Sequence, residues 1–105
     1  MEQFDVYENS GRNSKLIPLV LCIQSNLLSD LPSRVVVPLY LAKEIKNSII
    51  RLHVPLMVNN RKYLAIFDEI AALSCNRLKN KVCTVNETYQ KVLKDALDVL
   101  FFNFP

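Results

Sequence analysis

The clearest pattern of apolar and polar positions lies near the end of the chain. Apolar side chains recur there at spacings of three and four, which places them on one stripe of a helix. The preceding Thr84-Val85-Asn86-Glu87 has the form of a capping box, in which a hydroxyl and a glutamate satisfy backbone N–H groups. We therefore predict a helix over residues 85–102 whose stripe packs against a core. The stripe consists of Val85, Tyr89, Val92, Leu93, Ala96, Leu97 and Leu100.

The first part of the chain has the pattern of short strands separated by polar loops. Apolar or alternating runs predict strands at residues 3–8, 16–23 and 34–41. Pro18 lies inside the second run and cannot donate to a ladder, so we expect an edge or a bulge there. The intervening segments have the composition of loops, and the second of them, residues 24–33, carries the apolar residues Leu27 and Leu28.

The middle of the chain predicts one hairpin and less regular structure around it. Asn59-Asn60 stands between apolar runs at 54–58 and 61–67, and asparagine tolerates the positive φ of a two-residue turn. Residues 42–52 fit a short helix or a turn, and residues 70–83 fit one or two short strands. Several strands followed by one helix indicate a mostly antiparallel sheet or small barrel with a helix against it.

Length, charge and cysteine content narrow the class of protein. The 105 residues, half of them hydrophobic, fit a single domain with one modest core. The net charge is +3 and no basic run exceeds two residues, so we expect no direct nucleic-acid binding. The chain has three cysteines, an odd number, and shows no secretory signal. Its apolar stretches are too short to span a membrane. We therefore expect a cytoplasmic protein with no membrane partner.

Candidate catalytic and metal-binding residues are few. His53 is the only histidine, and no phosphate loop, nucleophile motif or paired cysteine motif occurs. We therefore expect no cofactor and no metal site, and a protein that is not an enzyme. Arg34 and Lys62 are expected to be surface charges. The cysteines, Cys22, Cys75 and Cys83, are expected to be small buried hydrophobic residues.

Three stretches of the sequence resemble the CcdB toxin family. They are Gln3-Phe4-Asp5-Val6-Tyr7, the segment from Ile23-Gln24-Ser25 through Arg34-Val35-Val36-Val37-Pro38-Leu39, and the terminal amphipathic helix ending Asp95-Ala96-Leu97-Asp98-Val99-Leu100-Phe101. The resemblance implies a mainly β fold, the Src-homology-3-like antiparallel barrel of the CcdB/MazF toxin superfamily with one C-terminal helix. It also implies a homodimer, which the pattern of residues alone does not.

The resemblance further implies the toxin of a type II toxin–antitoxin module. Such a toxin binds the A subunit of DNA gyrase, traps the enzyme with its DNA cleaved, and is neutralised by a CcdA-like antitoxin. The gyrase-binding positions would be Leu27, Leu28, Asp98, Phe101, Phe102, Asn103 and Phe104. The antitoxin-binding positions would be Glu8, Asn9, Ser10, Gly11, Arg12 and Asn13.

The same residues also allow interpretations that do not involve gyrase or an antitoxin. Gln24 and Ser25 also fit residues that cap the loop after a strand, and residues 8–15 also fit a plain hairpin loop. The terminal phenylalanines fit a dimer interface as well as a partner-binding tip. The chain ends Phe102-Asn103-Phe104-Pro105 where the family usually ends Trp-Gly-Ile. Two further functions therefore remain open: a detoxified homologue that dimerises and binds an antitoxin, and an RNA-cleaving toxin of the MazF/Kid type.

Overall fold

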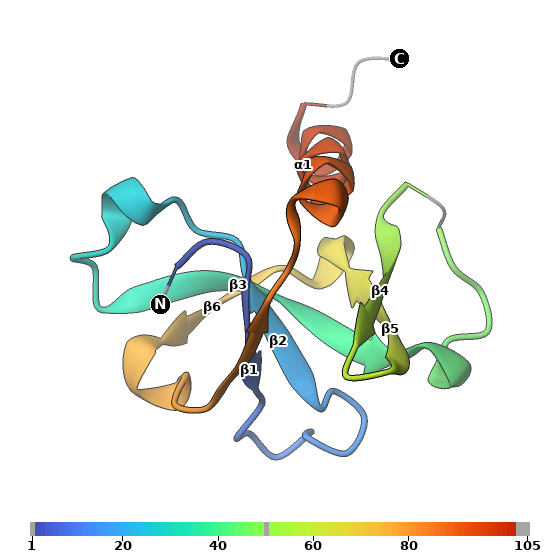
Figure 1. Cartoon of the computed structure of the whole chain (residues 1–105), viewed down its shortest axis with the longest axis horizontal. Coiled ribbons are helices and arrows are strands. Elements are labelled where there is room, and N and C mark those ends of the chain that lie inside the picture. Colours follow the sequence, from blue (N-terminus) through green and yellow to red (C-terminus); the bar gives the residue numbers. More distant parts are fainter. Residues whose placement is uncertain (1, 50, 103–105) are drawn as a thin grey trace.

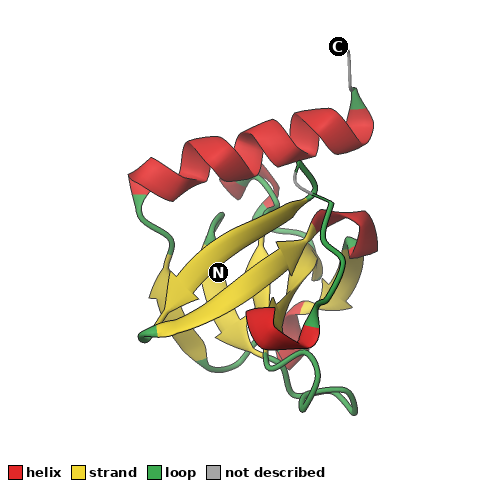
Figure 2. Cartoon of the chain, turned by 90° about the vertical axis from the view of Figure 1, so that its right-hand side faces the viewer, coloured by secondary structure: helices red, strands yellow, loops and turns green. Residues whose placement is uncertain are grey.

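The computed structural model describes residues 2–49 and 51–102. The strands form a curled antiparallel sheet, and one helix lies across one side of it (Figures 1 and 2). This confirms the predicted fold class. The strands are β1 (Asp5–Glu8), β2 (Leu19–Cys22), β3 (Ser33–Leu41), β4 (His53–Val58), β5 (Arg61–Ile66), β6 (Ala71–Ser74) and β7 (Lys81–Thr84). The α-helix is α1 (Glu87–Phe101), and the short 3-10 turns are η1 (Asn26–Leu28), η2 (Ala42–Glu44), η3 (Phe67–Glu69) and η4 (Cys75–Arg77).

The strand order is β4-β5-β3-β2-β1-β7, and β6 pairs with the first half of β3. β2 pairs with one edge of β3, so β5 and β6 both pair with the other edge. β6 pairs as far as Val36, and β5 begins to pair at Leu39. Pro38 lies at this junction, where a residue without an N–H does not interrupt either ladder.

The hairpin between β4 and β5 forms as predicted. Asn59 has φ of 49° and Asn60 has φ of 66°, so both central residues adopt the left-handed conformation that asparagine tolerates. The register runs without a break from Val58↔Arg61 to His53↔Ile66. The turn therefore fixes which side chain lies opposite which along both strands.

Alternate residues of the strands supply two packed faces. On the side of α1, Val6, Leu21 and Val37 pack in one buried cluster with Leu93 and Ala96 of the helix. The neighbouring residues in each strand point the other way. A smaller cluster of Tyr7, Val20, Val36 and Leu78 therefore lies on the sheet face away from α1.

The helix begins two residues later than predicted, and its cap differs. Asn86 is the N-cap, and its side chain accepts a hydrogen bond from the N–H of Tyr89 at 3.3 Å. Thr84 still belongs to β7, where its hydroxyl is engaged elsewhere, so the predicted capping box is wrong. Of the predicted stripe, Val85, Leu93 and Ala96 are buried, whereas Tyr89 and Val92 are exposed. No helix among the described residues is long and apolar enough to cross a bilayer.

Candidate functional site

The loop between β2 and β3 exposes Leu27 and Leu28 to solvent, and Leu31 of the same loop is 48% exposed. On η1, Leu27 is 94% exposed and Leu28 is 50% exposed. Gln24 supports the loop from beneath: its amide nitrogen donates to the carbonyl of Leu28 at 3.2 Å, and its oxygen accepts the N–H of Val35 at 3.1 Å. Ser25 accepts the N–H of Leu27 at 3.2 Å. The prediction that Gln24 and Ser25 cap this loop is confirmed, and the loop they shape leaves Leu27 free.

A buried arginine gives the same loop a second support. Arg34 is 5% exposed, and its guanidinium donates to the carbonyl oxygens of Leu31 at 2.6 Å, Ser33 at 2.9 Å and Ser29 at 2.5 Å. The prediction of a surface charge at Arg34 is therefore wrong. The chain folds back over the guanidinium, and carbonyl groups take the place of water around it.

The end of α1 forms an aromatic tip. Phe101 is 59% exposed and Phe102 is 66% exposed, and their ring centroids lie 6.5 Å apart at a tilt of 59°. Asp98 is exposed on the same turn, and its carbonyl accepts the N–H of Phe102 at 2.8 Å. One to two turns earlier, Ala96 and Leu93 anchor the helix in the core. The predicted partner-binding positions Asn103 and Phe104 lie outside the described residues.

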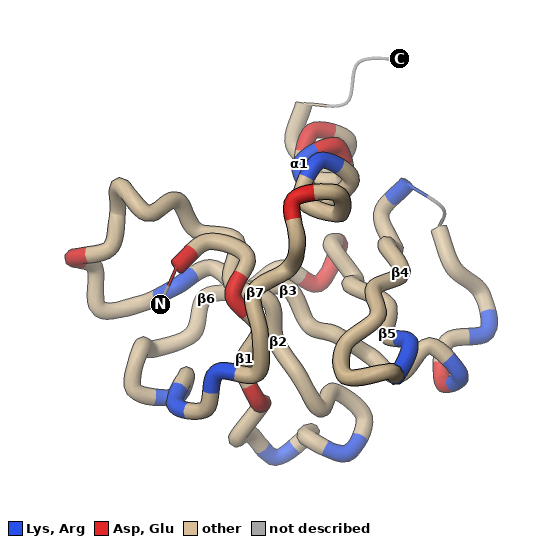
Figure 3. Tube along the Cα trace, viewed as in Figure 1, with Lys and Arg blue, Asp and Glu red and all other residues tan. Residues whose placement is uncertain are grey.

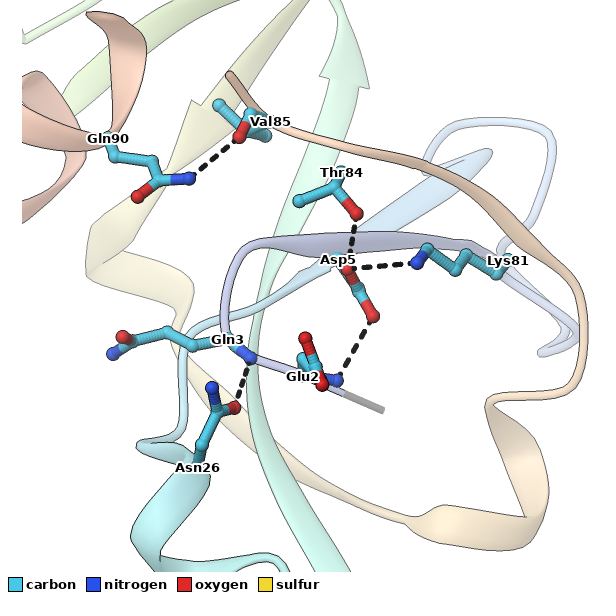
Figure 4. A network of polar contacts seen from close by, with 8 residues as sticks. All are labelled: Glu2, Gln3, Asp5, Asn26, Lys81, Thr84, Val85 and Gln90. Atoms are coloured by element: carbon cyan, nitrogen blue, oxygen red, sulfur yellow. Dashed lines mark hydrogen bonds and ion pairs between the residues drawn. The ribbon is translucent and has the colours of Figure 1, made fainter. Parts of the chain in front are cut away.

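The N-terminal segment links the η1 loop to the beginning of α1 (Figure 4). The N–H of Gln3 donates to the side-chain oxygen of Asn26, in η1, at 2.7 Å. The carbonyl of Phe4 accepts the N–H of Val85 at 2.9 Å, one residue before the helix cap. Phe4 has φ of 70°, a conformation that costs energy for a residue with a side chain. The segment is thus held in a bent form that contacts the η1 loop and the residue just before the helix cap.

The buried carboxylate of Asp5 holds the N-terminal segment in place. Asp5 is 2% exposed; it accepts hydrogen bonds from the Thr84 hydroxyl at 2.7 Å and the Glu2 N–H at 3.0 Å, and Lys81 Nζ lies 3.4 Å away. Burial acts to raise the pKa of Asp5, but these hydrogen bonds and the lysine charge outweigh it and hold the pKa below 3.8. The ionised carboxylate is therefore the form that the fold stabilises.

Acid is expected to weaken the fold through this residue. Because the pKa of Asp5 is lowered on folding, its stabilisation is complete above 3.8 and is lost as the pH falls through the folded value. Asp5→Asn should therefore flatten the decline in the free energy of unfolding between about pH 5 and about pH 2. Urea unfolding at a series of pH values measures this. Asp95→Asn, at an exposed carboxylate of α1, is the matched control and should keep the wild-type profile.

The residues assigned to antitoxin binding line one side of a surface pocket of about 460 Å³. Val20 of the smaller buried cluster belongs to the lining, so the pocket lies on the sheet face away from α1. The connection between β1 and β2 lies on the side of the molecule away from α1 (Figure 1). Leu73, Arg77 and Leu78, about 60 residues further along the chain, complete the lining. Sequence patterns identified the loop but not these three residues, because only the fold brings β6 and η4 against the β1–β2 connection.

His53 and Asp68 form a pair that no sequence pattern predicted. His53 Nε2 lies 2.9 Å from Asp68 Oδ1, and His53 Nδ1 accepts the N–H of Ile49 at 3.0 Å. The latter bond leaves Nε2 as the protonated nitrogen, which donates to Asp68. The β4–β5 register places His53 opposite Ile66, two residues before Asp68. Beside the pair lies a hollow of about 380 Å³ that includes Lys62 in its lining.

The cysteines differ among themselves. Cys22 is fully buried, as predicted, whereas Cys75 and Cys83 are only half-buried, so the prediction is wrong for those two. All three are free thiols. Burial is the largest cause that raises the pKa of Cys22 and of Cys83, so both favour the uncharged form.

Solved structures with the same fold include toxins and ribonucleases. One, an endoribonuclease in complex with its cognate antitoxin from Mycobacterial species, matches with a TM-score of 0.79 at 17% identity, over 100% of this chain and 99% of the other. A second endoribonuclease from Mycobacterial species matches with a TM-score of 0.76 at 19% identity, over 100% and 95%. An Mtb toxin matches with a TM-score of 0.73 at 14% identity, over 91% and 99%. At these identities the likeness is one of fold.

These neighbours contradict the prediction that the chain is not an enzyme, because two of them are named endoribonucleases and match it from end to end. The prediction rested on the lack of a catalytic motif along the sequence. The His53–Asp68 pair joins residues separated by 15 positions, which a motif search does not detect.

Membership of a family follows from the sequence as a whole. No curated protein sequence matches the chain. A family model for the CcdB protein matches residues 3–102, which include β1 through α1 and both exposed apolar regions. The chain belongs to the CcdB family.

Proposed function

We propose that this chain is the toxin of a type II toxin–antitoxin module, acting in the cytoplasm by binding the DNA gyrase A subunit and trapping the cleaved DNA complex. One observation carries the proposal: Phe101 and Phe102 stand exposed at the end of a helix that Leu93 and Ala96 hold in the core. Apolar anchors on a rigid element suit a pocket in a protein partner. Membership of the CcdB family supports the same role.

The active form that we propose is a homodimer. Tyr89 and Val92 expose apolar surface along α1, and Tyr89 lines a hollow of about 230 Å³ together with Met57 of β4. A second copy covering this face would remove that surface from water. It would also bring two aromatic tips to one side of the assembly, which suits a target that is itself a dimer.

Growth of a bacterial host on induction of the chain tests the gyrase proposal. The host carries either wild-type gyrase or a gyrase A subunit that resists toxins of this family. We expect killing only with wild-type gyrase. Equal killing in both hosts would overturn the gyrase target. Survival of both, with the protein present and folded, would indicate a detoxified homologue instead.

RNA cleavage is the second candidate function, favoured by the endoribonucleases of the same fold and by the His53–Asp68 pair. Lys62 lines the hollow beside His53 and could hold a phosphate there. To act as a base, the imidazole would need to exchange its bond to the Ile49 N–H for one to a substrate hydroxyl. If this site is active, purified chain cleaves RNA and His53→Ala removes the activity, while Cys75→Ala, in η4, retains it. Intact RNA with the wild-type chain would refute this function.

A further inference from the structure

The loop between β2 and β3 is folded with its backbone carbonyls inward and its apolar side chains outward. Gln24 and Arg34 lie buried beneath it. Their side chains donate hydrogen bonds to the carbonyl oxygens of Leu28, Ser29, Leu31 and Ser33. Because these backbone groups are satisfied from the inside, the apolar side chains of the loop are left facing solvent.

Three leucines lie on the outer surface of this loop. Leu27, Leu28 and Leu31 are all exposed, and none of them belongs to a buried cluster of the described residues. The N–H of Leu31 donates to the carbonyl of Leu28 at 3.2 Å. A turn closed by such a bond brings its first and fourth residues to within about 7 Å. Leu31 therefore extends the apolar surface that Leu27 and Leu28 begin.

The loop carries almost no charge. Residues 24–33 contain one charged residue, Asp30, the single acidic position on this part of the trace in Figure 3. The loop, cyan in Figure 1, projects from the side of the sheet. A nucleic acid is bound through lysine and arginine, and residues 24–33 include neither. The surface therefore suits an apolar pocket in a protein.

The sheet fixes the position of the arginine beneath the loop. Arg34 lies opposite Leu73 in the β3–β6 ladder, so its backbone is held. Its side chain reaches back to the carbonyl of Ser29, five positions earlier in the chain. Among the described residues no carboxylate forms an ion pair with it. Burying a guanidinium is costly unless it is hydrogen-bonded, so closure of the loop and burial of Arg34 depend on each other.

We propose that Leu31 is a further contact residue for the gyrase A subunit, and that Arg34 is the positioning residue that holds Leu27, Leu28 and Leu31 in their bound arrangement. The proposal rests on the gyrase function proposed above. It names the protein subunit, rather than the DNA that gyrase holds, as the occupant of the loop surface. An apolar anchor held in place before binding contributes more, because less conformational freedom is lost on association. The planar guanidinium suits this role because it donates to three carbonyls at once.

Titration of the gyrase A subunit, without DNA, with the full-length chain tests the contact. We expect Leu31→Ser to raise Kd about tenfold. Leu16→Ser, in the connection between β1 and β2, is the matched control and should leave Kd unchanged, because Leu16 is also 48% exposed. Both positions are on the surface, so both variants should fold as the wild type does. Wild-type affinity of Leu31→Ser, or equal weakening by the control, would overturn the contact.

Arg34→Lys tests the positioning role in the free chain and in the complex. Lysine keeps the charge without the planar fork, so amide relaxation should show increased motion of Leu27 and Leu28. We expect Kd to rise about tenfold, and adding Leu31→Ser should then cost less than about twofold, since a mobile loop no longer presents Leu31. Additive losses, or a loop that stays ordered in Arg34→Lys, would show that Arg34 only stabilises the fold.

Failure of the gyrase function is distinguishable from failure of this inference. A wild-type chain that does not bind the A subunit refutes that function together with the contact at Leu31, whereas the relaxation measurement still decides whether Arg34 orders the loop. Wild-type binding that Leu31→Ser leaves unchanged refutes the contact alone. Dissociation of the dimer by Leu31→Ser, measured by sedimentation, would assign the leucines to an interface between two copies of the chain and overturn the proposal.

Discussion

Phe102→Ala is expected to weaken binding of the chain to its protein target by about 2 kcal/mol or more, close to thirtyfold in Kd. Phe102 is 66% exposed at the end of α1, so its ring is free to enter a partner's pocket. The expected loss is the apolar contact of one aromatic anchor, since the backbone of the helix end stays held by its bond to Asp98. Titration of the gyrase A subunit with wild-type and variant chain measures the difference.

Leu16→Ala is the matched control for this effect. Leu16 is also an exposed apolar residue, but it lies in the connection between β1 and β2, away from α1 and from the face proposed for the dimer. Its truncation should leave gyrase binding near the wild-type value. Sedimentation of each variant separates the two roles considered for Phe102. If Phe102→Ala dissociates the dimer, the residue is an interface residue, and the proposed hot spot is refuted.

Leu93→Ala is expected to lower the free energy of unfolding by about 3 kcal/mol. Leu93 is fully buried and packs with Val6, Leu21 and Val37 beneath α1. Truncation removes this contact and leaves a cavity that the sheet and the helix cannot fill without moving. Such a loss is a large part of the stability of a domain of this size.

Val92→Ala is the control for Leu93, because the adjacent residue has a similar aliphatic side chain on the exposed side of the same helix. It should change the free energy of unfolding of the monomer by less than about 0.5 kcal/mol. Urea unfolding at low protein concentration measures both variants. Equal effects of the two would show that α1 does not dock through the face assigned to it.

Local chemistry made part of this structure predictable. The period of the apolar residues gave α1, and Asn59-Asn60 gave the β4–β5 turn, because both signals depend on residues close together in the chain. The exposed tip was predictable for a related reason. Aromatic residues beyond the end of a buried stripe, such as Phe102, have no core within reach.

Other features depend on contacts between distant segments. Thr84 looked like a helix cap, but β7 pairs with β1 and turns its hydroxyl to Asp5. Arg34 was expected to be a surface charge, but the loop before it closes over the guanidinium. Strand pairing selected the partner of Thr84, and closure of the loop before β3 selected the partners of Arg34.

Patterns along the chain were enough to predict α1, the β4–β5 hairpin and the exposed helix end, because periodicity and turn chemistry depend on residues close in sequence. Which polar groups meet depends on contacts between distant segments. The His53–Asp68 pair and the placement of Arg77 beside Gly11 both follow from strand register and sheet curvature. Side chains from residues 8–20 and 73–78 line one pocket because an antiparallel sheet brings together segments that no local pattern relates.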